Sequence, residues 1–413
     1  MMNSSLKGCD LLTAIQRFRM AVLLGSLAAF GPLTIDMYLP SFPTIANDLS
    51  TNASLVQVSL TACLLGLGLG QMFLGPLSDI QGRRKPLLIG IALYVVASLI
   101  CAVSSSIELF IAGRFIQGFA ASAGIVISRA IVRDMFSGLE LTKFFALLML
   151  LNGLAPILAP VVGGVILEFT DWNGIFYVLS AVGGIMLLIV FSSLKETLPL
   201  EKRVPSTILS TFRTFIDLLK DRQFTGYALT QGFMTGAIFA YVSGTPFVYQ
   251  TIYGVSPQTF SYLFGVNGLG LMLGVFLVGR FANKYSETRI LQVGLTIAGI
   301  ASVTLFFTTL FQGPLVLIAI PLFFFVSTIG LISTTSFSLA IETQGHRAGS
   351  ASALLGLLPF LLGSITAPLT GIAGESTALP MSSVILISIA LSWLAYLGLV
   401  RKGQQSIERG VSH

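Results

Sequence analysis

Twelve apolar segments, each about as long as a bilayer-spanning helix, follow one another along almost the whole chain. A helix needs about 20 mostly apolar residues to cross the hydrocarbon core of a membrane. Only 10% of the 413 residues are charged, whereas a soluble domain has about 25%. The sequence therefore predicts an all-α membrane protein with twelve transmembrane helices and no separate soluble domain. The predicted spans are residues 20–42, 55–76, 86–104, 107–131, 141–167, 172–194, 224–249, 259–280, 289–311, 314–339, 347–373 and 378–400.

The loops of this arrangement differ in charge from one side to the other. The loops on one side contain no lysine or arginine and carry Asp48, Glu108, Glu168, Asp171 and Glu375. The loops of the other side, the terminal segments and a central connector contain most of the basic residues. Because positively charged loops remain in the cytoplasm, we expect both termini to be cytoplasmic. This distribution also argues against a nucleic-acid partner, although the net charge is +6.

The glycine pattern repeats between the two halves of the chain. At a constant offset, Gly66 and Gly70 align with Gly270 and Gly274, and each pair is followed by a loop on the predicted cytoplasmic side. Parallel six-helix repeats are one architecture of secondary transporters, with cargo bound near the midplane between the halves. We therefore expect two six-helix pseudo-repeats, with an N-terminal bundle at 1–194, a cytoplasmic connector at 195–222 and a C-terminal bundle at 223–413.

The loop after the second predicted span reads GPLSDIQGRRKP at residues 75–86. Glycines permit a tight reversal there, and the aspartate can pair with an arginine or accept hydrogen bonds from a helix N-terminus. The string resembles the signature loop of the major facilitator superfamily, G-x-L-[SA]-D-x-x-G-R-[RK], although Ile80 stands where the family usually has a basic residue. The resemblance implies a cytoplasmic gate, to which we assign Gly75, Asp79, Gly82, Arg83, Arg84 and Arg133.

Four further strings extend the resemblance: TIDMYLPSFP (34–43), RFIQGFAA (114–121), RAIVRDMF (129–136) and APILAPVVGG (155–164). With them the chain resembles the bicyclomycin and chloramphenicol resistance branch of the drug:proton antiporters. The resemblance implies proton-driven export of small antibiotics across a bacterial cytoplasmic membrane. It also implies a packing element of antiporters in the fifth span, formed by Pro156, Pro160, Gly163 and Gly164.

Asp36 and Arg114 are the ionisable side chains predicted to lie deep within the spans. An aspartate at the centre of a spanning helix costs about 2.5 to 3.5 kcal/mol on insertion scales. Both residues lie about 10 Å below the outer ends of their spans, given a rise of 1.5 Å per residue. In the fold that the resemblance implies, both helices line the central cavity, so we expect the two charges to share a water-filled site. An acid in a closing cavity can bind and release a proton as its surroundings change. We therefore predict that Asp36 carries proton coupling and that Arg114 tunes it.

Polar side chains on the predicted cavity-lining spans can bind a cargo. The second half has no deep charge equivalent to Asp36 or Arg114, and offers scattered hydroxyl and amide groups among many phenylalanines and methionines. Such surfaces suit varied apolar ligands that make a few hydrogen bonds. The candidate cargo-cavity residues are Tyr38, Gln117, Asn152, Gln231, Thr235, Tyr241 and Ser333.

Two other functions are compatible with parts of this pattern. A proton-coupled transporter of one native metabolite would have the same architecture, and a membrane-embedded enzyme is a third possibility. An enzyme would need clustered acids, histidines or cysteines at depth, but His346 and His413 lie outside the predicted spans. The chain also has no phosphate-binding G-x-x-x-x-G-K-[ST] loop and no metal-spaced cluster. We therefore predict a monomeric transporter in a lipid bilayer, with drug-like cargo, protons as the coupling ion, no cofactor and no enzymatic activity.

Overall fold

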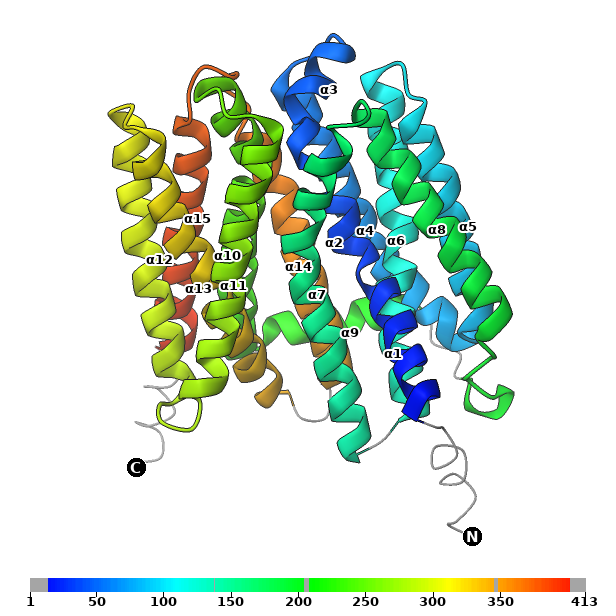
Figure 1. Cartoon of the computed structure of the whole chain (residues 1–413). Helices are drawn as coiled ribbons and strands as arrows, with labels where there is room; N and C mark the ends of the chain where they lie inside the picture. The colour runs from blue at the N-terminus through cyan, green and yellow to red at the C-terminus, as the bar shows by residue number, and fades with distance from the viewer. Residues whose placement is uncertain (1–13, 137, 204–207, 345–347, 402–413) are drawn as a thin grey trace, which may run out of the picture.

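The computed structural model describes residues 14–136, 138–203, 208–344 and 348–401, and these residues are almost entirely helical. In Figure 1 the long helices stand side by side in two bundles, and α9 lies across the lower end between them. We call the end at which α1 begins and α9 lies the terminal face, and the other end the opposite face. His346 and His413 lie outside the described residues.

The first half of the chain forms one bundle. Its elements are α1 (Ala14–Ala28), α2 (Phe30–Asp36), η1 (Leu39–Ser41), α3 (Phe42–Asp48), α4 (Ala53–Gln81), α5 (Arg84–Ala102), α6 (Ile107–Met135), α7 (Gly138–Ile166) and α8 (Trp172–Ser193).

The connector and the second bundle follow. Their elements are η2 (Leu200–Lys202), α9 (Ile208–Lys220), α10 (Arg222–Phe247), η3 (Val248–Ile252), α11 (Pro257–Phe281), α12 (Glu287–Leu310), α13 (Leu315–Glu342), α14 (Ala348–Leu369), α15 (Leu379–Ala395) and η5 (Tyr396–Arg401).

The lengths of the helices suit a membrane. Among the described residues, nine helices are long and apolar enough to cross a bilayer, and the bent pair Arg19–Ala28 and Phe30–Asp48 meets the same condition as one span. The long helices α7 and α10, of 29 and 26 residues, complete the arrangement. The predicted twelve-helix fold class is therefore confirmed.

The first predicted span, 20–42, is a broken helix rather than a continuous one. Pro32 has no N–H group to bond the carbonyl of Ala28, and α1 ends at Ala28. The chain bends by 40° there and continues through α2, which ends at Asp36, to the end of α3 at Asp48. The bend places Asp36 at the end of a short helix in the middle of the bundle, so its side chain faces the interior.

The predicted repeat is visible in helix packing. A Cβ atom added at Gly66 or Gly70 would collide with the backbone of α6. In the second half, a Cβ atom at Gly274 would collide with the backbone of α13, and one at Gly270 would collide with the hydroxyl of Ser327 on the same helix. Small residues permit this close approach of membrane helices, where little hydrophobic effect drives association. Equivalent glycines therefore join equivalent helix pairs in the two pseudo-repeats.

The two halves contact each other directly at the opposite face. The backbone N–H of Ala53 donates a hydrogen bond of 3.1 Å to the carboxylate of Glu375. The Gln57 amide donates one of 3.3 Å to the carbonyl of Ser243. These contacts join the start of α4 to the second half.

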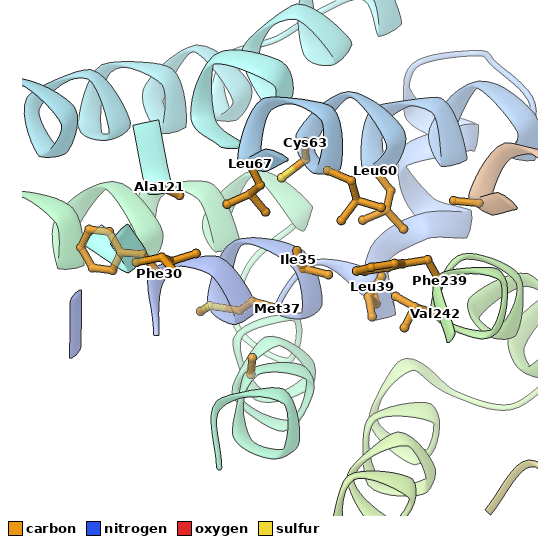
Figure 2. Close-up of a cluster of buried hydrophobic side chains, with 14 of the residues drawn as sticks. Phe30, Ile35, Met37, Leu39, Leu60, Cys63, Leu67, Ala121, Phe239 and Val242 are labelled. Carbon is orange, nitrogen blue, oxygen red and sulfur yellow. The ribbon is translucent and has the colours of Figure 1, made fainter. Parts of the chain in front are cut away.

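Apolar side chains of both halves form one continuous core. Figure 2 shows Phe239 and Val242 of α10 beside Leu39 and Leu60 of the first half. This packing extends the contact between the halves from the opposite face toward the middle of the molecule.

Candidate functional site

A central cavity of about 310 Å³ lies between the two halves. Residues of α2, α4, α6 and α7 form its walls on one side, and residues of α10, α11, α13 and α14 form them on the other. Its size is at the lower end of the range for small-molecule sites. Most of its lining is apolar, and its polar lining residues are Asp36, Gln71, Arg129, Tyr241 and Asn267.

Asp36 is the acidic group of this cavity. The residue is only 6% exposed, and its carboxylate makes no hydrogen bond or ion pair with any residue that the structure describes. Apolar neighbours such as Ile35 and Phe264 share the cavity wall with it. A carboxylate in such surroundings is costly to keep charged unless water or a ligand supplies hydrogen bonds. The arrangement can therefore bind a proton or a hydrogen-bond donor.

Arg114 lies elsewhere, in a fully buried cluster within the first half. Its guanidinium donates hydrogen bonds to the carbonyl of Thr34, at 2.8 Å, and to the side-chain oxygen of Gln117. It also stacks over the ring of Tyr38, 4.1 Å from the ring centre. Arg114 lines neither of the two cavities described here. The structure therefore places Arg114 outside the lining of the cavity that contains Asp36, because the side chain turns to the backbone of α2 instead.

A second cavity, of about 460 Å³, lies beside the loop between α4 and α5 at the terminal face. It shares Gln71, Arg129 and Gly356 with the central cavity, so the two cavities adjoin at these residues. Phe215 of the connector helix α9 contributes to its wall.

Arg129 is a charged cavity residue that the sequence did not indicate, as Gln71 and Asn267 are uncharged ones. The predicted fourth span, 107–131, places Arg129 only two residues from its end. α6 continues to Met135, which places Arg129 about 9 Å inside the helix. The string RAIVRDMF contained the signal for this longer helix, because polar residues can continue a transmembrane helix by a turn beyond its apolar run.

The predicted gate loop is held together by Arg83. Its guanidinium bonds Asp79 one turn earlier, Asp134 of α6 at 2.7 Å and the hydroxyl of Ser78 at 2.8 Å. Burial alone would lower the pKa of Arg83, but the hydrogen bonds and charges of Asp134 and Asp79 outweigh it and raise the pKa above its ordinary value. The expected pairing of Asp79 with an arginine is therefore present, within the same loop.

Glu196, at the start of the connector, binds the same loop. Its carboxylate lies beside Gly82, whose φ of 92° lies in the left-handed region that favours glycine. Burial would raise the pKa of Glu196, but hydrogen bonds from backbone N–H groups outweigh it and hold the pKa below its usual value. These donors belong to Arg83, Arg84, Thr197 and Leu198, at 2.8 to 3.1 Å.

The remaining gate residues surround this loop. Gly75 and Arg133 line the terminal-face cavity. Arg84 donates a hydrogen bond of 2.7 Å to the carbonyl of Phe191 at the end of α8. The loop is thus tied to α5, α6 and α8.

The proline and glycine element of α7 joins three parts of the molecule. Pro156 lines the central cavity, and Pro160 is buried. A Cβ atom at Gly163 would collide with the carbonyl of Met37 in the first span, and one at Gly164 with the hydroxyl of Ser261 in the second half. The element therefore lets α7 approach both neighbours closely.

The candidate cargo residues are distributed unevenly. Tyr241 lines the central cavity, accepts a hydrogen bond of 2.9 Å from Asn267 and stacks on Phe264. Tyr38 and Gln117 belong to the buried cluster of Arg114. Gln231, Thr235 and Ser333 line neither of the two cavities described, and the side chain of Asn152 lies outside the described residues.

The sequence was compared with known families and proteins. Residues 24–368 match the family model described as Major Facilitator Superfamily. The chain is 56% identical over 398 residues to the uncharacterized MFS-type transporter YdgK of Bacillus subtilis (strain 168), covering 95% of this chain and 99% of that protein. It is 35% identical over 389 residues to a bicyclomycin resistance protein homolog of Haemophilus influenzae, covering 94% and 98%.

The fold was compared with solved structures. A bacterial homolog of the human lysosomal transporter Spinster, in an inward-facing and unoccupied conformation, superposes with a TM-score of 0.75 at 15% identity. The superposition covers 94% of this chain and 99% of that one. At this identity, the likeness concerns the fold.

Proposed function

Because the chain belongs to the Major Facilitator Superfamily, we propose that it exports small drug-like molecules from the bacterial cytoplasm in exchange for protons. Relatives named for bicyclomycin resistance support the cargo class. The concentration of basic residues in the terminal-face loops supports a cytoplasmic position for that face. In this proposal the protein is a monomer of the cytoplasmic membrane that needs no cofactor, binds no nucleic acid and catalyses no covalent reaction.

The observation that carries the proposal is the carboxylate of Asp36, which lies in a cavity between the two halves and has no partner among the described residues. Charged Asp36 accepts hydrogen bonds from water or cargo, whereas protonated Asp36 fits the apolar lining better. Cargo and proton therefore compete for one site. Cargo binds from the terminal face, and a proton that arrives from the opposite face displaces it. The protonated carrier then returns and releases the proton inside.

One proton supplies enough free energy for this exchange. A gradient of one pH unit contributes about 1.4 kcal/mol, and a membrane potential of 100 mV contributes about 2.3 kcal/mol. Their sum corresponds to a several-hundred-fold concentration ratio of a neutral cargo.

The test is the substitution Asp36→Asn, which mimics the protonated side chain permanently. In inverted membrane vesicles with an acidic interior, adding chloramphenicol should release protons through the wild-type protein, as measured by a pH-sensitive dye. Asp36→Asn should abolish this release, because the exchanged proton has no acceptor. The variant should still insert, since a neutral side chain is cheaper to bury.

Asp171→Asn is the matched control, because Asp171 is exposed at the opposite face. It should behave as wild type. Wild-type proton release by Asp36→Asn would refute the role of Asp36. If drug-like probes move no protons through the wild-type protein, the transporter of one native metabolite becomes the better proposal.

A further inference from the structure

Arg129 is a cation at the junction of the two cavities. Its side chain is half-buried and belongs to the walls of both. It makes no hydrogen bond or ion pair with any residue in the described ranges. Gln71 and Gly356 are the other residues shared by the two walls. A molecule that moves from the terminal face to Asp36 therefore passes the guanidinium of Arg129.

The other charges along this path do not neutralise Arg129. In the terminal-face cavity, the carboxylate of Asp79 is paired with Arg83, which also binds Asp134. Arg133 contributes a further positive charge to that wall. In the central cavity Asp36 is the other charged lining residue, and no ion pair joins it to Arg129. The path is therefore positively charged for an entering molecule.

An arginine remains protonated in proteins and presents five N–H donors. Keeping such a group in an apolar cavity is costly when its donors lack acceptors. A carbonyl, nitro or carboxylate oxygen of a bound molecule supplies the missing acceptor. A cationic molecule instead brings a second positive charge into surroundings where repulsion is stronger than in water. This repulsion should lower its occupancy by about tenfold or more.

We infer that Arg129 determines the charge class of the cargo. Molecules with an apolar body and an acceptor oxygen, neutral or anionic, bind beside it, and cations are excluded. This inference rests on the proposed export function and names its substrate class. The apolar wall formed by Phe264, Val326 and Phe360 would hold the body of such a molecule.

Two probes with a common body test the inference on the purified full-length protein. Chloramphenicol is neutral and carries nitro and amide oxygens, whereas its deacylated amine is a cation at neutral pH. Equilibrium binding of both is measured in detergent, and uptake of both is measured in proteoliposomes. The variants are Arg129→Gln, which removes the charge, and Arg129→Lys, which keeps the charge but loses the planar donor fork. Arg280→Gln, exposed at the end of α11, is the control.

The wild type and Arg280→Gln should bind chloramphenicol at least about tenfold more tightly than the amine. Arg129→Gln should reduce this preference to within about threefold, because the variant binds chloramphenicol more weakly and binds the amine more tightly. Arg129→Lys should still exclude the amine but bind chloramphenicol about tenfold more weakly, because it loses charge-assisted hydrogen bonds.

An unchanged preference in Arg129→Gln would overturn the role of Arg129 while leaving proton exchange through Asp36 intact. If Arg129→Gln fails to fold, unchanged chloramphenicol affinity in Arg129→Lys overturns the role instead. A wild-type protein that binds and transports neither probe would remove the proposed drug export, and this inference with it.

Discussion

Arg114 and Arg129 lie on the same helix, α6, but in different surroundings. Fifteen residues separate them, which corresponds to about 22 Å along the axis and a rotation of about 60° around it. Arg114 is fully buried and bonded to the carbonyl of Thr34. Arg129 faces two cavities and has no partner among the residues that the structure describes. The two arginines therefore have different roles. Arg114 holds the first span in place, and Arg129 lines the two cavities.

Glu196 gives a prediction on pH dependence at the residue scale. Its pKa is lower in the folded protein than in the unfolded chain, because backbone N–H groups hold the carboxylate. The stabilisation is therefore fully present above the ordinary glutamate pKa of about 4.3 and is lost as the pH falls through the lower folded value. We expect the thermal unfolding midpoint of wild type to exceed that of Glu196→Gln at pH 7, and this difference to close below about pH 4.

Glu201→Gln is the control for this comparison, since Glu201 is an exposed glutamate of the same connector. It should not change the midpoint at pH 7. Equal midpoints of wild type and Glu196→Gln at pH 7 would show that the carboxylate does not stabilise the gate loop.

The position of a charged residue along a spanning helix could be predicted from the sequence, but the side to which its side chain points could not. Hydropathy correctly placed Asp36 and Arg114 inside the spans. The side to which each points depends on the rotation of the helix and on the bend after Ala28, neither of which hydropathy records. Arg129 was missed for a related reason, because the end of α6 extends beyond its apolar run to Met135.

At the scale of elements, close contacts through glycine hold the paired helices together, and α11 offers a matched test. A Cβ atom at Gly274 would collide with the backbone of Ser327 on α13, whereas one at Gly279 meets nothing within 4 Å. Gly274→Ala should destabilise the protein by about 1 to 3 kcal/mol, because α11 and α13 must separate. Gly279→Ala should be neutral or stabilise by up to about 1 kcal/mol, because alanine favours a helix. Heat stability followed by size-exclusion chromatography measures both.

The outcome against this prediction is equal stability of the two glycine variants. It would mean that α11 and α13 tolerate a larger separation than their contact indicates. The sequence does show the pair Gly270 and Gly274, and their spacing of four residues puts both on one face of the helix. It did not predict the partner helix, since spacing says nothing about which neighbour occupies that face.

At the scale of the whole molecule, the halves meet at the opposite face, and two adjoining cavities extend from the centre toward the terminal face. In transporters built from such repeats, two similar bundles rock about a central site. The sequence could not predict which of the two faces is closed in this structure, because one sequence must be compatible with closure at either face in a transporter of this kind. The contacts that close this end combine the hydrogen bonds of Glu375 and Gln57 with apolar packing, such as that of Phe42 against Phe247.

Glu375 should control how often the opposite face opens. Its carboxylate accepts the hydrogen bond from Ala53 across the two halves, and a bond to a charged group contributes about 1.5 to 3 kcal/mol. Glu375→Ala should increase the fraction of molecules whose opposite face is open by about tenfold or more. In a variant without native cysteines, Tyr241→Cys in the central cavity should then react correspondingly faster with an impermeant thiol reagent added at the opposite face.

Glu168→Ala is the control, because Glu168 is exposed on the same face and lies outside the contact between the halves. It should leave the labelling rate unchanged. If Glu375→Ala also leaves it unchanged, other contacts between the halves close this face.

The two halves contribute different chemistry to the central cavity. Its charged side chains, Asp36 and Arg129, belong to the first half, while its aromatic wall of Phe239, Tyr241, Phe264 and Phe360 belongs to the second. Under the proposed export function, substitutions in the second half could reshape the aromatic wall for a new antibiotic while Asp36, the proposed proton carrier in the first half, stays unchanged. In this proposal, duplication separates the half that can adapt from the half that must be preserved.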